Sequence, residues 1–104
     1  MLTDDADVRA LAETFKLLGD MTRVRILHAL AASELCVSEI ARQVGLSESA
    51  VSHQLRLMRG MRVVRPRRAG RMIFYALDDQ HIAGLLEQGL HHVQERAANG
   101  RGGA

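Results

Sequence analysis

The apolar residues of this chain keep a helical spacing over most of its length and lose it in one short stretch. Hydrophobic side chains recur every three or four positions through residues 7–60 and again over residues 82–93. Between these regions, residues 63–65 and 72–75 are rich in β-forming side chains, and they flank a glycine-containing segment, residues 66–71, that we expect to be a loop. The pattern predicts a mainly helical fold with one small β-hairpin.

Capping residues and glycines set the boundaries of the expected helices. Asp and Ser side chains accept hydrogen bonds from the unpaired N–H groups at a helix start, whereas glycine readily ends a helix. The expected helices are residues 7–18 ending at Gly19, residues 21–32 capped by Asp20, residues 39–44 capped by Ser38 and ending at Gly45, residues 48–60 capped by Ser47, and a last helix capped by Asp78 or Asp79. The expected order of elements is therefore α-α-α-α-β-β-α.

The length of 104 residues allows one folded domain. We expect it to span residues 7–96, with a flexible tail over residues 1–6 and a disordered tail over residues 97–104, where small residues dominate. No apolar run approaches the roughly 20 residues that cross a membrane. The single cysteine, Cys36, excludes an internal disulfide, so we expect a cytoplasmic protein without membrane contacts.

The third and fourth expected helices, joined by a tight turn at Gly45, form a helix-turn-helix unit. The exposed first turns of the fourth helix carry short polar and amide side chains that are able to reach base edges in a DNA groove. The candidate DNA-contacting residues of this helix are Ser47, Ser49, Ser52, His53, Gln54 and Arg56. Gln54 suits the donor–acceptor pair of adenine, and Arg56 suits a phosphate.

The positive charge of the chain is concentrated in and just after the fourth helix. The net charge is only +2, yet seven arginines fall between residues 56 and 71. A two-stranded hairpin that follows a helix-turn-helix unit forms a wing, and the tip of this wing carries Arg67, Arg68 and Arg71 for contact with the DNA backbone or the minor groove. The alternative is a plain helical pair beside a solvated arginine loop.

Two segments carry a more specific signal, residues 34–40 (ELCVSEI) and residues 46–55 (LSESAVSHQL). Together with the pattern around them, they resemble the ArsR/SmtB family of winged-helix metal-sensing repressors over about residues 8–96. The resemblance implies a homodimeric transcriptional repressor that binds a dyad-symmetric DNA operator and releases it when a metal ion binds.

Members of this family use different metal sites, and each has to be compared with the residues of this chain. A site built on a Cys-x-Cys pair has its first position at Cys36, but its second position is Ser38, whose hydroxyl does not replace a soft thiolate. We therefore expect Cys36 to be a buried small hydrophobic residue. In the last helix, the resemblance implies a zinc site with four ligands, which are Asp79, His81, His92 and Glu95.

Helix geometry requires two copies of the chain for this site. His81, His92 and Glu95 fall within about 60° around a helix, yet the two histidines are 11 positions apart, which corresponds to about 16 Å along its axis. Two last helices packed antiparallel bring Asp79 and His81 of one copy to His92 and Glu95 of the other. Two imidazoles and two carboxylates suit tetrahedral Zn²⁺, with Co²⁺ as a substitute in vitro.

Other functions fit parts of the sequence. An ArsR-type repressor that senses a non-metal or redox signal through Cys36 lacks a second, resolving cysteine. A small zinc hydrolase using His81, His92 and Glu95 needs an open coordination position and a substrate cleft, for which a short chain with ligands at a dimer rim has little room. A helical adaptor leaves the basic wing unexplained. We therefore expect a DNA-binding repressor, with no enzymatic activity and no small-molecule substrate.

Overall fold

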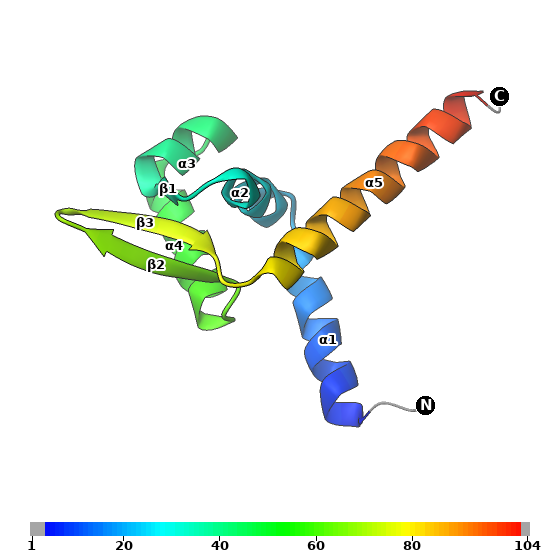
Figure 1. Cartoon of the computed structure of the whole chain (residues 1–104), viewed down its shortest axis with the longest axis horizontal. Helices are drawn as coiled ribbons and strands as arrows, with labels where there is room; N and C mark the ends of the chain where they lie inside the picture. The colour runs from blue at the N-terminus through cyan, green and yellow to red at the C-terminus, as the bar shows by residue number, and fades with distance from the viewer. Residues whose placement is uncertain (1–3, 103–104) are drawn as a thin grey trace.

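Three helices and a small sheet form the body of the protein, and two further helices extend from it in different directions (Figure 1). The computed structural model describes residues 4–102. Its elements are α1 (Asp5–Leu18), α2 (Met21–Ala32), β1 (Leu35–Cys36), α3 (Val37–Val44), α4 (Glu48–Gly60), β2 (Val64–Ala69), β3 (Met72–Leu77) and α5 (Gln80–Gly102). The predicted winged helix-turn-helix fold is confirmed, with α3 and α4 as the helical pair and β2 and β3 as the wing.

Side-chain caps start three of the helices where the sequence predicts them. Carboxylate oxygens of Asp20 and Asp79 and the hydroxyl oxygen of Ser47 each accept a hydrogen bond from the backbone N–H three residues further on, at 3.0, 3.2 and 3.1 Å respectively. The predicted end of α3 at Gly45 is also confirmed, because this glycine adopts the left-handed conformation with φ of 73°. Local chemistry therefore sets most of the helix boundaries.

The start of α3 differs from the prediction. The helix begins at Val37, and the residue at its cap is Cys36 rather than Ser38. Glu39 explains the shift, because its carboxylate accepts a hydrogen bond of 3.0 Å from the backbone N–H of Cys36. This backbone contact, reinforced by the Cys36 side chain, lowers the pKa of the Glu39 carboxyl below its ordinary value.

Both expected tails are partly helical. Residues 5–6 belong to α1 because the side chain of Asp4 caps that helix, accepting a hydrogen bond from the Ala6 N–H at 3.1 Å. At the other end, α5 continues through residues 97–102, and the alanines that open this segment are strong helix formers. The remaining parts of the two expected tails, residues 1–3 and 103–104, lie outside the described residues.

The sheet has three antiparallel strands rather than the two of a simple hairpin, because β1 pairs with β3 on the side opposite β2. A strand of two residues is too short to show an alternating pattern in the sequence. Residues 66–69, expected in a loop, belong to β2 and pair with β3. Pro66 is tolerated in β2 because this is an edge strand. The connection is thereby reduced to Gly70 and Arg71.

The chain reverses sharply between α4 and the wing. Arg62 adopts φ of 59°, a left-handed conformation that is uncommon for residues other than glycine. The reversal is closed by a backbone hydrogen bond of 2.9 Å from the Val63 N–H to the Met58 carbonyl. Met58 is fully buried and Val63 is nearly so, which anchors both sides of the turn in the core.

The core is built from aliphatic side chains and Met58 of the body. Its fully buried members are Ile26, Leu27, Ile40, Val51, Leu55, Met58 and Val64. The described part of α1 adds only Leu17, and that of α5 only Ile82. Large apolar side chains elsewhere on these two helices are instead exposed, including Phe15 at 54% and Val93 at 55%. A single copy of the chain therefore leaves apolar surface on α1 and α5 uncovered.

Within residues 4–102, no helix combines the length and the apolar character needed to cross a lipid bilayer.

We expect Gly45→Ala to lower the free energy of unfolding by about 1 kcal/mol, because a Cβ is strained at φ of 73°. No atom lies within 4 Å of the added Cβ, so the loss has no steric component from neighbours. Gly60→Ala is the matched control, since Gly60 lies in the last turn of α4 with equally open space. Urea denaturation measures both variants, and an equal loss in the two contradicts the assignment of Gly45 as a strained turn.

Candidate functional site

The pair of α3 and α4 presents a polar face on the first turns of α4. Buried Ile40 and Ala41 of α3 pack in the same core as Val51 and Leu55 of α4, which locks the two helices together. The exposed candidate residues on α4 and at its cap are Ser47, Ser49, His53 and Arg56, whereas Ser52 is half-buried. The Ser47 hydroxyl is already used as the helix cap and lies 3.3 Å from the Ser49 hydroxyl.

Gln54 is held differently from the free amide that an adenine contact requires. It is half-buried, and its side-chain oxygen accepts a hydrogen bond of 3.0 Å from the Nε–H of Arg23 on α2. The same guanidinium also donates to the backbone carbonyl of Leu17 at 3.4 Å. Gln54 therefore joins α4 to α2, and a two-point contact with adenine requires its oxygen to leave Arg23 or to accept a second bond.

The three predicted wing arginines divide into two kinds. The Nε of Arg67 lies 2.7 Å from a carboxylate oxygen of Glu34, and its guanidinium carbon lies 5.3 Å from the centre of the Phe74 ring. Arg68 and Arg71 are exposed and make no ion pair or side-chain hydrogen bond with another residue of the described range 4–102. The wing thus presents two unengaged cations and one that is paired within the protein.

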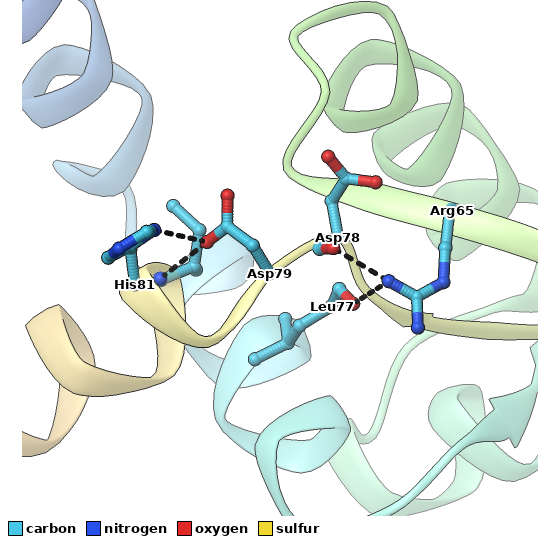
Figure 2. Close-up of polar contacts among 6 residues, drawn as sticks. Arg65, Leu77, Asp78, Asp79 and His81 are labelled. Atoms are coloured by element: carbon cyan, nitrogen blue, oxygen red, sulfur yellow. Dashed lines mark hydrogen bonds and ion pairs between the residues drawn. The ribbon is translucent and has the colours of Figure 1, made fainter.

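The first half of the candidate metal site lies at the start of α5 (Figure 2). The Nδ1 atom of His81 is 3.6 Å from Oδ1 of Asp79, and both side chains are exposed, His81 to 93%. Two ligands that each lie about 2.0–2.1 Å from a tetrahedral zinc ion are about 3.4 Å apart. The separation of Asp79 and His81 therefore fits two ligands of one ion, although Oδ1 of Asp79 also caps the helix.

Arg65, which the sequence did not single out, holds the segment before these ligands. Its Nη1 donates hydrogen bonds to the backbone carbonyls of Leu77 at 3.1 Å and of Asp78 at 2.6 Å (Figure 2). This contact ties β2 of the wing to the residue that precedes Asp79. The sequence places Arg65 in the basic stretch but carries no signal for the direction of its side chain.

The second half of the candidate site lies more than halfway along α5. His92 and Glu95 line one shallow pocket together with Arg96 and Asn99. Oε2 of Glu95 lies 3.8 Å from Nδ1 of His91, so Glu95 must turn from His91 to serve as a ligand beside His92. Within one copy of residues 4–102, no group of three His, Cys, Asp or Glu side chains is close enough to hold a metal ion.

Cys36 does not form part of either surface. Its exposure is 5%, and its Sγ lies 3.2 Å from the hydroxyl of Ser38. The interpretation of Cys36 as a buried small residue is therefore confirmed. This burial offers no support for a sensor of oxidants at this thiol, since reactive cysteines need solvent access.

Comparison with known protein sequences identifies relatives that are transcription regulators. Residues 20–65 match the family model described as "Bacterial regulatory protein, arsR family". The chain is 47% identical over 85 residues to a transcriptional repressor SmtB homolog from Synechocystis, in a match that covers 82% of this chain and 64% of that protein. It is 37% identical over 91 residues to a cadmium resistance transcriptional regulatory protein CadC homolog from Staphylococcus aureus, covering 86% and 75%. The match thus spans just under two thirds of the SmtB homolog.

Solved structures share the fold over nearly the whole chain. The crystal structure of the AntR antimony-specific transcriptional repressor superimposes with a TM-score of 0.86 at 36% identity, over 94% of this chain and 89% of that one. A homodimeric winged helix-turn-helix DNA-binding domain from Mycobacterium bovis superimposes with a TM-score of 0.80 at 25% identity, over 94% and 92%. The metals in these names differ, so the names do not determine a metal for this chain.

We expect the Arg23–Gln54 contact to act as a structural tie between α2 and α4. A double-mutant cycle of Arg23→Ala, Gln54→Ala and the combined variant should give a coupling of about 1 kcal/mol in the free energy of unfolding, because the hydrogen bond is partly buried and charge-assisted. Urea denaturation of the four proteins measures the coupling. Strictly additive losses contradict the tie.

Proposed function

Because the chain belongs to the ArsR family of bacterial regulatory proteins, we propose that it is a homodimeric cytoplasmic repressor whose operator binding is switched by a metal ion. The family and these relatives are DNA-binding transcription regulators and not enzymes, which leaves the hydrolase hypothesis without support.

The proposed DNA-binding surface combines α4 with the wing. Ser49 and His53 on the exposed face of α4 enter a major groove, with Arg56 beside the phosphates. Arg68 and Arg71 at the wing contact the backbone next to it. A two-fold dimer presents this surface twice, and two successive major-groove sites on one face of DNA are about 34–36 Å apart. The operator is therefore expected to have dyad symmetry.

The observation that carries the metal proposal is the layout of α5. Exposed Leu85 and Leu90 lie between Asp79 and His81 at one end and His92 and Glu95 further along, and exposed Val93 lies between His92 and Glu95. Burial of this stripe against the same stripe of a second, antiparallel α5 gives the dimer a hydrophobic driving force. The packing that covers the apolar residues is also the packing that joins the two halves of the site.

The donor set of the joined site fits zinc. Asp79 and His81 from one copy with His92 and Glu95 from the other supply two nitrogen and two oxygen ligands, which is a suitable set for tetrahedral Zn²⁺ and for Co²⁺ in vitro. His91, the neighbour of His92, is not a member of this set. When bound, the ion links the two α5 helices at both ends of their contact.

The proposed switch follows from this link. A pair of α5 helices linked by zinc favours one arrangement of the two subunits. If the metal-free protein is the repressor, the operator must favour a different arrangement. Binding of zinc then lowers operator affinity, and binding of operator lowers zinc affinity by the same factor. The resemblance to metal-sensing repressors implies this direction, in which zinc binding opposes operator binding and releases the DNA.

We expect the metal-free dimer to bind a fluorescent duplex taken from the region upstream of its own gene, and Zn²⁺ to weaken that binding by about 5- to 150-fold. Fluorescence anisotropy with Zn²⁺, Co²⁺, Ni²⁺ and Cd²⁺ in parallel titrations measures the effect and ranks the metals. Failure of every metal to change the affinity contradicts the switch. A larger response to Cd²⁺ or Ni²⁺ than to Zn²⁺ contradicts zinc as the metal.

We expect His92→Gln to abolish the zinc response and His91→Gln to leave it intact, because only His92 belongs to the proposed ligand set. Both histidines are exposed neighbours on α5, so the pair is matched in position and chemistry. The visible absorption of bound Co²⁺ reports tetrahedral coordination directly and should be lost in the first variant alone. An unchanged Co²⁺ spectrum in His92→Gln removes this histidine from the site.

A further inference from the structure

Arg67 of the wing reaches across the sheet to an acidic residue outside the wing. Its Nε lies 2.7 Å from Oε1 of Glu34, which directly precedes β1. On the way, its guanidinium lies over the Phe74 ring with its central carbon 5.3 Å from the ring centre. The cation is therefore engaged both by a carboxylate and by an aromatic face.

The order of the strands fixes the direction in which Arg67 points. β3 lies between β1 and β2, and Phe74 of β3 is the register partner of Arg67 on β2 and of Cys36 on β1. Residues that face each other across paired strands lie on the same side of a sheet. The Arg67 side chain thus runs from the edge strand β2, over β3, toward β1. The three strands can be followed in Figure 1. It turns inward, away from the outer edge of the wing.

The next arginine along the strand is not engaged in this way. Arg68 projects from the opposite side of β2, because successive strand residues alternate between faces. It is exposed, and neither it nor Arg71 has an ion-pair partner within residues 4–102. Glu34 therefore neutralises one particular arginine of the wing and not the others.

We propose that Glu34 withholds Arg67 from DNA and so weakens the binding of the wing to the phosphate backbone in general. A phosphate group that recruits Arg67 has to replace the Glu34 carboxylate and then lies near that unpaired negative charge. The pair is open to such competition because its side chains are 58% and 41% exposed, for Arg67 and Glu34 respectively. Contacts made in the DNA grooves by α4 do not involve Arg67 and are unaffected.

This inference rests on the proposed contact between the wing and DNA, and its test is chosen to separate the two. The variants are Glu34→Gln, Arg67→Gln and the combination of both, with Glu87→Gln as a control that removes the same charge from an exposed site on α5. Anisotropy with a duplex of unrelated sequence measures non-specific affinity across a series of salt concentrations. The upstream duplex is measured alongside it.

We expect Glu34→Gln to bind the unrelated duplex more tightly than the wild type. The slope of log affinity against log salt should steepen by about 0.9 per subunit, or about 1.8 for the dimer, since each subunit adds one phosphate contact. The gain in affinity should then shrink about 25-fold between roughly 50 and 300 mM salt. The combined variant should lose the added slope because Arg67 is absent, and Glu87→Gln should keep the wild-type slope. Binding to the upstream duplex should tighten in the same direction, because the proposed wing contact is to its phosphates as well.

Three results overturn the inference. Glu34→Gln with unchanged or weaker non-specific binding shows that Arg67 is not withheld. If the combined variant keeps both the higher affinity for the unrelated duplex and the steeper salt slope of Glu34→Gln, the effect comes from the change in net charge and not from Arg67. Wild-type protein that binds neither duplex removes the proposed function as well, which distinguishes the two failures.

Discussion

The structure depends on burial of aliphatic side chains where α2, α3, α4 and β2 meet. With three aromatic residues in every hundred and no tryptophan, the chain has few large side chains, and Ile, Leu, Val and Met fill the body. This body accounts for nearly every fully buried residue, and α1 and α5 each contribute a single buried side chain at the end nearest to it. Most of the large apolar side chains on α1 and α5 therefore stay exposed in a single copy, and a second copy can cover them.

Arginine side chains supply ties that the hydrophobic core does not. Arg23 links α2 to α4, Arg65 links β2 to the end of β3 and the residue after it, and Arg67 links the wing to Glu34. Each contact spans elements that are distant in sequence. A planar guanidinium is suited to such ties because it has several N–H donors. It can donate hydrogen bonds to more than one acceptor at the same time, whether a backbone carbonyl, an amide oxygen or a carboxylate. The basic stretch of the sequence is therefore partly structural.

Much of the fold was predictable because its determinants are local. Asp20, Ser47, Asp79 and Gly45 start or end helices through contacts within a few residues, and the sequence reveals such contacts directly. β1 was missed because its pairing with β3 depends on residues about forty positions away, and two residues carry no periodicity. The expected start of α3 at Ser38 was wrong because the side chain of Glu39 reaches back to the Cys36 N–H.

The arrangement of the candidate metal ligands on α5 was predictable from the sequence, whereas the contacts made by two of the candidate DNA-binding residues were not. Helical periodicity alone places the two halves of the metal site far apart on one face of α5, and a single chain indeed brings no three such ligands together in its described range. The engagement of Gln54 and Arg67 was not predictable, because their partners Arg23 and Glu34 come from elements whose placement only the folded chain defines. Side-chain direction, rather than residue type, is what the sequence lacked.

The reversal at Arg62 has a mechanical consequence for the proposed switch. Since a backbone bond closes it and buried residues anchor both sides, the angle between α4 and the wing is set by the main chain and not by a hinge. In the proposed dimer, α4 and the wing of one subunit therefore move together as one rigid unit when the subunits rearrange. Under the proposed function, metal binding then changes the distance between the two DNA-binding surfaces of the dimer and not the shape of either surface.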